Sequence, residues 1–257
     1  MVVVIPGIQG RWEWMTPGVD ALARRCRVIT YSLCDEPSCG GSFDEETGFD
    51  CYVEQVREAL DQAGVERATI CGLSYGGLIA CAFAARYPER TRGLVLISAL
   101  PPSWTPDARV RFYLRAPRLL MPMFMLASLR MYREIAAAHP GAWAGAREAV
   151  RHAWNVLTHM FSPSRMARRV HLLARARLGN LAAPRVPTLV ITGDHALDRV
   201  VPVTATREYL QWLPDARTVV VERTGHLGFI TRPDIFADVV APFAAGSSGT
   251  ESRRRIG

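Results

Sequence analysis

A serine lies between glycines where a buried strand pattern passes into a helix pattern. The segment Gly72-Leu73-Ser74-Tyr75-Gly76 follows the apolar stretch 68–71 and opens a stretch of small residues with helical spacing. Glycines at these positions allow a tight, strained turn that lifts the serine hydroxyl above the edge of a sheet. The Tyr75 amide and the helix N-terminus would then face negative charge that forms on a bound carbonyl. The pattern predicts that Ser74 is a nucleophile.

A serine nucleophile needs a base and a carboxylate, and both follow later strand patterns. His226 comes after the stretch 218–221, and Asp194 and Asp198 come after the stretch 188–192. Because a serine hydroxyl is a poor nucleophile at neutral pH, His226 would take its proton while one carboxylate orients the imidazole. The predicted catalytic group is therefore a serine, a histidine and an aspartate, in the chain order Ser, Asp, His.

The elements that must position these residues alternate between strand and helix patterns. Strands are expected at 2–5, 27–31, 68–71, 93–97, 188–192 and 218–221, and helices at 14–24, 49–63, 75–86, 204–213 and 233–243. Strands that are apolar throughout and separated by helices predict a mostly parallel sheet covered by helices on both faces. The fold class is therefore α/β.

The alternation stops after Pro101-Pro102 and resumes about 80 residues later. The intervening stretch has helical periodicity without a strand signal, which predicts a helical cap at 103–180. The core would then consist of 1–102 and 181–245. The polar tail, 246–257, is expected to be disordered.

The overall composition is that of a globular protein, with 49% hydrophobic and 21% charged residues. No apolar run approaches the roughly 20 residues that a membrane span needs, and no signal-peptide pattern precedes the first strand. A cytoplasmic protein without a membrane span is expected. The six cysteines lack zinc-site spacing, and reduced thiols are favoured, although Cys34 and Cys39 share a loop and could pair. No dinucleotide or phosphate-binding fingerprint occurs, so neither a cofactor nor a metal is expected.

The positive charge is concentrated in the predicted cap. All 31 basic residues are arginine, and the stretch from Asp107 to Arg177 holds 13 of them against three acidic residues. Two interpretations stay open: a solvated arginine-rich surface, or a surface that receives an acidic partner such as a carrier protein. Nucleic acid is not expected, because no recognition motif accompanies the charge.

The serine turn and the order of the three catalytic residues resemble the α/β-hydrolase superfamily, in its serine esterase and lipase branch with a helical cap. The stretch 3–10, Val-Val-Ile-Pro-Gly-Ile-Gln-Gly, resembles the oxyanion loop of that family, with Pro6 in place of the usual histidine. The resemblance implies that the backbone amides of Ile8 and Tyr75 form the oxyanion hole.

The same resemblance bears on the acid and on the start of the sheet. The family usually shows Gly-x-x-Asp-x-x-x-Pro, and counting back from Pro202 selects Asp198 over Asp194. Family members usually carry a β-hairpin before the strand at 2–5. This chain begins at that strand, so either the hairpin is absent and the sheet is expected to have six strands, or Met1 is not the natural start.

The predicted reaction is hydrolysis of a carboxylic ester or lactone, a small-molecule substrate, through an acyl-enzyme. Alternatives are carbon–carbon bond hydrolysis with the same triad, an esterase for acyl groups on an acidic carrier protein, and a binding protein without activity. The oligomeric state stays open. The residues expected around the substrate are Gln9, Trp12, Trp14, Met121, Met123, Phe124 and Leu227.

Overall fold

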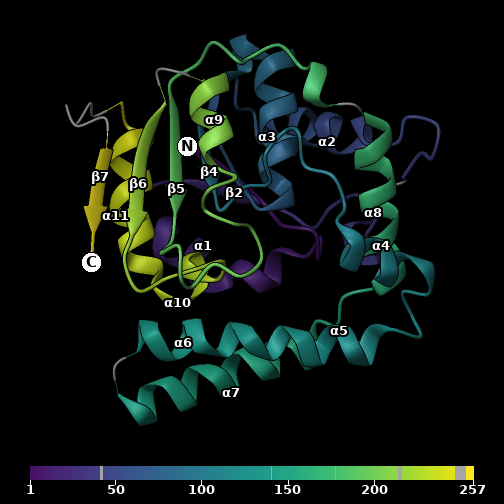
Figure 1. Ribbon diagram of the computed structural model, residues 1–257. Helices are drawn as coiled ribbons and strands as arrows, with labels where there is room; N and C mark the ends of the chain where they lie inside the picture. Colours follow the sequence, from purple (N-terminus) through teal and green to yellow (C-terminus); the bar gives the residue numbers. More distant parts are fainter. Residues whose placement is uncertain (41–42, 140, 177, 214–215, 247–252) are drawn as a thin grey trace.

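The computed structural model describes residues 1–257 except 41–42, 140, 177, 214–215 and 247–252. In this part of the chain one sheet has seven strands in the order β2-β1-β3-β4-β5-β6-β7, and every neighbouring pair is parallel (Figure 1). The strands are β1 (Val2–Ile5), β2 (Val28–Thr30), β3 (Ala68–Leu73), β4 (Thr91–Ile97), β5 (Thr188–Thr192), β6 (Arg217–Val221) and β7 (Arg253–Ile256). The predicted α/β class with a parallel sheet is confirmed.

Helices cover both faces of the sheet because successive strand side chains point to opposite sides. Val3 and Ile5 belong to the apolar cluster under one set of helices, and Val2 and Val4 belong to the cluster on the other face. The first face is covered by α2 (Asp50–Gln62), α3 (Tyr75–Arg86) and α9 (Arg207–Trp212), and the second by α1 (Thr16–Ala23), α10 (Gly228–Thr231) and α11 (Pro233–Ala244). Strands that are buried on both sides explain the apolar runs in the sequence.

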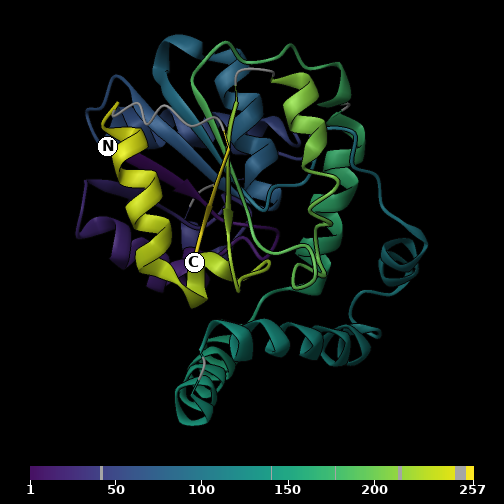
Figure 2. The ribbon, with the colours of Figure 1, turned by 60° about the vertical axis from the view of Figure 1, so that its left-hand side comes forward.

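A helical insertion lies between β4 and β5. It consists of α4 (Ala108–Arg115), α5 (Met121–Ser128), α6 (Tyr132–Ala138), α7 (Ala142–Thr158) and α8 (Pro163–Ala176), with short 3₁₀ turns between some of them. Helix α8 lies along the body of the molecule, whereas α5, α6 and α7 lie beyond the carboxyl ends of the strands (Figures 1 and 2). The insertion therefore covers the edge of the sheet where the predicted catalytic residues emerge.

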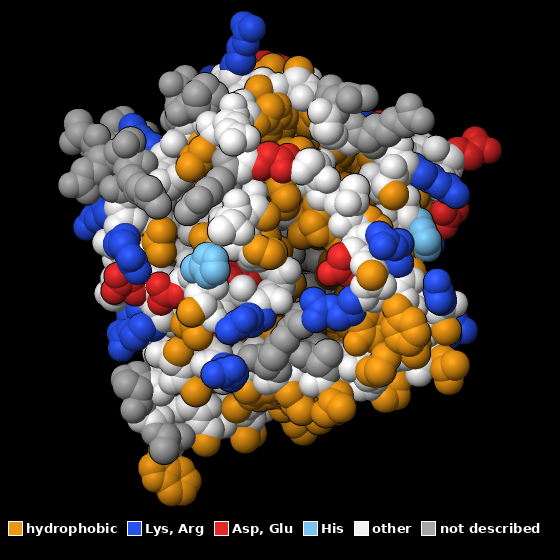
Figure 3. Space-filling view, viewed as in Figure 1, with side chains coloured by type: hydrophobic (Ala, Val, Ile, Leu, Met, Phe, Trp, Pro, Cys, Tyr) orange, Lys and Arg blue, Asp and Glu red, His pale blue; other side chains and the backbone are white. Residues whose placement is uncertain are grey.

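The outer face of α7 is apolar and exposed. Trp143, Val150, Trp154 and Leu157 recur at helical spacing and are all at least two-thirds exposed. Figure 3 shows hydrophobic side chains gathered along this lower margin of the molecule, with arginines above them. The opposite face of α7 carries Glu148 and His152, which are buried. Helix α7 therefore exposes large apolar side chains and buries two polar ones, unlike an ordinary surface helix.

The chain end corrects the expected disordered tail and the expected six strands. Residues 247–252 lie outside the described part, but Arg253–Ile256 form β7, which pairs in parallel with β6. This pairing satisfies the backbone of β6, which would otherwise be an open edge. Ile256 packs against the apolar cluster, and Arg255 forms ion pairs with Glu222 and Asp194. The polar composition of the tail concealed a strand that depends on its neighbour.

None of the described helices is long and apolar enough to cross a membrane. All six cysteines are free thiols, including Cys34 and Cys39. Burial raises the pKa of the Cys34 thiol to about 12, so it packs as a neutral side chain.

Candidate active site

Ser74 occupies a strained turn between β3 and α3. Its backbone has φ 51° and ψ −116°, a region that side-chain-bearing residues rarely adopt. The glycines around it are sterically required. A methyl group on Gly72 would overlap the carbonyl of Gly76, one on Gly76 would overlap the carbonyl of Pro6, and one on Gly77 would overlap Ala99. The Gly-x-Ser-x-Gly pattern therefore exists because strand, turn and helix pack backbone to backbone.

The loop after β1 presents an amide beside this turn. A methyl group added to Gly7 would lie 3.5 Å from the Cβ of Ser74, so the two backbones are close neighbours. The Gly7 carbonyl accepts a hydrogen bond from the Gly10 amide at 2.9 Å. The Gly7 carbonyl and the Ile8 N–H belong to the same peptide group. Because C=O and N–H of a planar trans peptide point in opposite directions, the Ile8 N–H points away from the Gly10 amide. The Tyr75 amide belongs to the first turn of α3, where amides have no partner within the helix.

His226 and Asp198 lie on the loops that follow β6 and β5. Nδ1 of His226 is 3.5 Å from Oδ2 of Asp198, and the aspartate is 5% exposed. The other carboxylate oxygen of Asp198 accepts hydrogen bonds from the amides of Val200 and Val201 at 3.0 and 2.9 Å. Burial acts to raise the pKa of Asp198, but the attraction of His226 and these hydrogen bonds outweigh it and lower the pKa. An ionised carboxylate beside Nδ1 leaves the other imidazole nitrogen to act as a base.

Asp194 has a different place in the same loop. It accepts a hydrogen bond from the Arg223 amide at 2.6 Å and forms an ion pair with Arg255. Arg223 has φ 56°, so this contact holds a strained backbone position three residues before His226. The structure thus brings Asp198, and not Asp194, to the imidazole, as counting back from Pro202 predicted.

One cavity of about 520 Å³ is lined by Ser74 and His226 together. The predicted neighbours Ile8, Tyr75, Gln9, Trp14, Met121, Phe124 and Leu227 also line it. Trp12 and Met123 do not. They are 36% and 43% exposed, because the 3₁₀ turn at Trp12–Met15 and helix α5 present them to solvent. Their neighbours Trp14 and Phe124 occupy the inward faces, a choice that sequence spacing left open.

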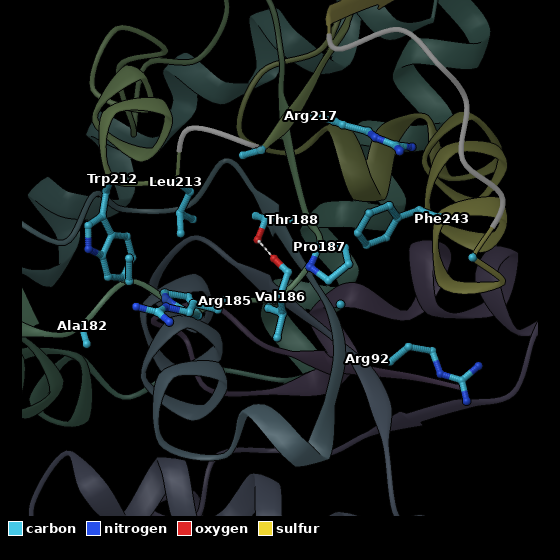
Figure 4. Close-up of a pocket in the computed structure, with 15 residues that line it drawn as sticks. Arg92, Ala182, Arg185, Val186, Pro187, Thr188, Trp212, Leu213, Arg217 and Phe243 are labelled. Carbon is cyan, nitrogen blue, oxygen red and sulfur yellow. Dashed lines mark hydrogen bonds between the residues drawn. The ribbon is translucent and has the colours of Figure 1, made fainter.

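A larger cavity of about 950 Å³ lies at the opposite edge of the sheet (Figure 4). It is bordered by residues at the amino ends of strands, among them Gly93, Thr188 and Arg217. The side chains of Arg92, Arg185 and Arg217 point apart in Figure 4 and do not converge on a common point. Parallel sheets bind ligands at the carboxyl ends of their strands. The smaller cavity is therefore the candidate site.

A buried arginine of the insertion supports the Ile8 loop. Arg169 of α8 is fully buried, and its guanidinium contacts Asp35 and Glu36, each at 2.6 Å. It also donates to the Ile8 carbonyl at 2.7 Å. Gly10, at φ 77°, has no room for a side chain because the guanidinium fills that space. Sequence reasoning counted Arg169 only as part of a basic surface.

The neighbouring arginines are also paired within the molecule. Arg168 contacts Asp35 and Glu45 at 3.0 and 2.8 Å, and Arg165 contacts Glu36 at 3.3 Å. The hypothesis that these three arginines receive an acidic partner therefore loses its main support. They join α8 to the loop after β2.

A second buried charge of the insertion, Glu134 on α6, reaches the loop that carries His226. Its carboxylate accepts a hydrogen bond from the Gly225 amide at 2.7 Å. Burial raises the pKa of Glu134 to about 7, although hydrogen bonds from the backbone of Leu227 and Gly225 and the charge of His226 act in the opposite direction. No local pattern indicates this contact, because Glu134 and Gly225 are 91 residues apart in the chain.

Comparison with known proteins assigns the family. The model of the alpha/beta hydrolase family matches residues 2–239. The chain belongs to the α/β-hydrolase family. A 2-hydroxymuconate semialdehyde hydrolase of Pseudomonas putida is 30% identical over 78% of this chain and 70% of its own length. A protein of Azorhizobium caulinodans named as the carbamate hydrolase RutD is 28% identical over 94% of this chain and 90% of its own length.

The solved structures agree with this family. The enol-lactonase of Burkholderia xenovorans LB400 superposes with a TM-score of 0.76 at 25% identity, covering 95% of this chain and 90% of that one. These relatives share the fold but differ in the bond that their names say they cleave. Among the described residues, no group of three or more His, Cys, Asp or Glu side chains is placed to hold a metal ion.

Proposed function

We propose that this α/β-hydrolase is a serine hydrolase that cleaves carboxylic esters or lactones through an acyl-enzyme. One observation carries the proposal: Ser74 and His226 line a single cavity, and Asp198 faces Nδ1 of His226 at 3.5 Å. The strained turn at Ser74 adds support, because strain of this kind persists where a mechanism uses it.

Each residue has a distinct role in this reaction. Ser74 Oγ attacks the carbonyl carbon while Nε2 of His226 takes the hydroxyl proton. The amides of Ile8 and Tyr75 stabilise the oxyanion, and His226 returns the proton to the departing alcohol oxygen. Water, activated by the same imidazole, then hydrolyses the acyl-enzyme. Asp198 keeps the imidazole in the required tautomer and stabilises the imidazolium.

The cavity suits a small, largely apolar acyl group. Trp14, Met121, Phe124 and Leu227 supply apolar walls, and methionine can repack around substrates of different shape. The helical insertion would act as the cap that closes this space. A lactone is a natural candidate because an internal ester needs no separate alcohol site, and an enol-lactonase is among the structural neighbours.

A second candidate is the hydrolysis of a carbon–carbon bond with the same catalytic residues. It is favoured by the sequence similarity to a 2-hydroxymuconate semialdehyde hydrolase. An esterase for an acidic carrier protein has less support, because Arg165, Arg168 and Arg169 are paired with carboxylates of the core.

The decisive experiment is labelling with a fluorophosphonate probe, which reacts covalently only with an activated serine. Wild type should be labelled, and Ser74→Ala should not. Ser98→Ala is the matched control, because Ser98 is also buried with a positive φ but does not line the cavity. Labelling that survives Ser74→Ala would refute the proposal.

A substrate panel then separates the candidate reactions. It should contain p-nitrophenyl esters of increasing chain length, small lactones, and a vinylogous diketone for carbon–carbon cleavage. We expect turnover of short esters or lactones to exceed that of the diketone. The reverse order would favour the second candidate without affecting the assignment of Ser74.

A further inference from the structure

The turn that carries His226 is held from the helical insertion by one carboxylate. Glu134 is 2% exposed, and the Gly225 amide donates to its Oε1 at 2.7 Å. The Leu227 amide also acts on this carboxylate and lowers its pKa. These two amides lie directly before and after His226 in the chain, so one side chain interacts with the backbone on both sides of the imidazole.

The same turn is packed against the loop that carries Asp198. A methyl group on Gly225 would lie 2.7 to 2.8 Å from the backbone of Leu197 and Asp198. The Asp194 amide donates to the Thr224 carbonyl at 2.8 Å. A shift of the peptide that Glu134 holds would therefore change how the imidazole of His226 meets Asp198.

The charges around Glu134 come from the catalytic loops and not from an arginine. His226 and Asp198 are the titratable groups that act on it, the first favouring its ionised form and the second opposing it. On the helix packed beside it, α7, Glu148 pairs with Arg151 and interacts with His152. In the described part of the chain no arginine forms an ion pair with Glu134. When Glu134 is ionised, its negative charge therefore acts mainly on His226.

We propose that Glu134 is a positioning residue of the catalytic site, which holds the His226 turn through the Gly225 amide and places a carboxylate beside the imidazole. The inference builds on the proposed function, in which His226 is the base. It gives the insertion a second role besides covering the cavity. The imidazole of His226 would face Asp198 correctly only while α6 is packed against the core.

The first test is the pKa of the His226 imidazole, measured by NMR titration in wild type and in Glu134→Gln. An anionic neighbour stabilises the imidazolium, so its removal should lower this pKa by about 0.5–1 unit. The measurement needs no substrate and is valid whether or not the ester hydrolase proposal holds. An unchanged pKa in a folded variant would refute the electrostatic part of the inference.

The matched control is Glu148→Gln, which neutralises another buried carboxylate of the insertion. Glu148 contacts Arg151 at 2.6 Å and does not touch the His226 turn, so the pKa of His226 should stay at its wild-type value. An equal fall in both variants would mean that any charge in the insertion has this effect, and the specific role of Glu134 would be rejected.

Kinetics supply a second readout. In Glu134→Gln, kcat should fall by about 10- to 100-fold with little change in KM, because a displaced base affects the chemical step more than binding. The acidic limb of the kcat/KM profile should move to lower pH, since the imidazole loses protons more readily. A change in KM with kcat unaltered would contradict the inference. So would an acidic limb of the kcat/KM profile that stays at its wild-type pH.

The variant Glu134→Asp covers the case in which Glu134→Gln does not fold. It keeps the charge but withdraws it by one methylene from the Gly225 amide. Hydrogen exchange of the Gly225 and Leu227 amides should become faster, and kcat should fall, while the overall fold is retained. Unchanged exchange and unchanged kcat would show that the Glu134 carboxylate does not position the base.

Discussion

The two halves of the candidate active site are both fastened to the helical insertion, but in different ways. The nucleophile half, with Ser74 and Ile8, is held by Arg169 of α8. The base half, with His226 and Asp198, is held by Glu134 of α6. Each fastening is a single buried charge from the insertion, and each contacts the backbone of a loop and not a reacting group.

The halves differ in how that charge is compensated. Arg169 faces two carboxylates, and its own pKa is raised by their attraction although burial opposes the rise. Glu134 has backbone amides and a histidine in place of a permanent cation, and burial raises its pKa to about 7. Arg169 therefore keeps its charge at every ordinary pH, whereas Glu134 changes its charge near neutrality.

The largest expected effect lies within the base half. Asp198→Asn should lower kcat by about 10⁴-fold, because the imidazole loses the partner that sets its tautomer. Asp194→Asn should cost far less, since Asp194 accepts from the Arg223 amide and does not face the imidazole. Steady-state kinetics of the two variants on one ester decide the matter. A larger loss of kcat from Asp194→Asn would mean that Asp194, and not Asp198, is the catalytic acid.

The next effect concerns the nucleophile half. Arg169→Met should lower the free energy of unfolding by about 3 kcal/mol, because it leaves Asp35 and Glu36 buried with weaker partners. Arg168→Gln is the control, since Arg168 is one-third exposed and its removal should cost about 1 kcal/mol or less. Urea unfolding followed by circular dichroism measures both. Equal losses of unfolding free energy in the two variants would show that the buried ion pairs of Arg169 stabilise the protein no more than the exposed ones of Arg168.

The contrast between the halves also explains how far the sequence could be interpreted. The first six strands, the Ser74 turn and its glycines follow from patterns within about ten residues, and these strands occur within about two residues of their predicted bounds. Asp198 depended on counting back from Pro202, which is still a local argument. Arg169 and Glu134 have partners that are 134 and 91 residues away, so spacing along the chain carries no trace of them.

The errors have the same origin. Strand β7 is polar, and it forms because β6 offers an open edge, which is a property of another segment. Trp12 and Met123 are residue types that often line pockets, but here they face solvent. The orientation of a short helix about its own axis is set by the surface against which it packs. Local patterns predicted the elements, whereas contacts between distant elements decided which side chains reach the site.

A pH titration of stability should separate the two fastenings. The folded-state pKa of Glu134, about 7, lies above the value of 4.5 for an unperturbed glutamate. Its contribution to stability is therefore complete below pH 4.5 and is lost as pH rises through 7, by about 3 kcal/mol. Asp198 acts in the opposite direction, because its pKa is lowered, and its contribution is lost only as pH falls below about 4.

Glu134→Gln should therefore flatten the stability profile between pH 4.5 and 7. Arg169→Met should not flatten it, because Glu134 stays in place and two buried carboxylates lose their partner. Thermal unfolding at half-unit pH steps provides the measurement. A wild-type slope that persists in Glu134→Gln would mean that another group titrates in this window.

The smallest expected effect tests the arginines that remain after the internal pairs are removed from the basic surface. Arg109 and Arg199 line the cavity and are exposed, and no ion pair among the described residues involves them. Replacing both by Gln should lower kcat/KM for an ester with a carboxylate on its acyl group by about 2- to 5-fold, the magnitude of an exposed charge pair. Salt at 0.5 M should produce the same loss in wild type, because exposed attraction is screened over distances of about 10 Å or less. Neutral esters should respond to neither change. If neutral and anionic esters respond alike, the charge at the mouth of the cavity does not select the substrate, and the distinction between the halves rests on the buried charges alone.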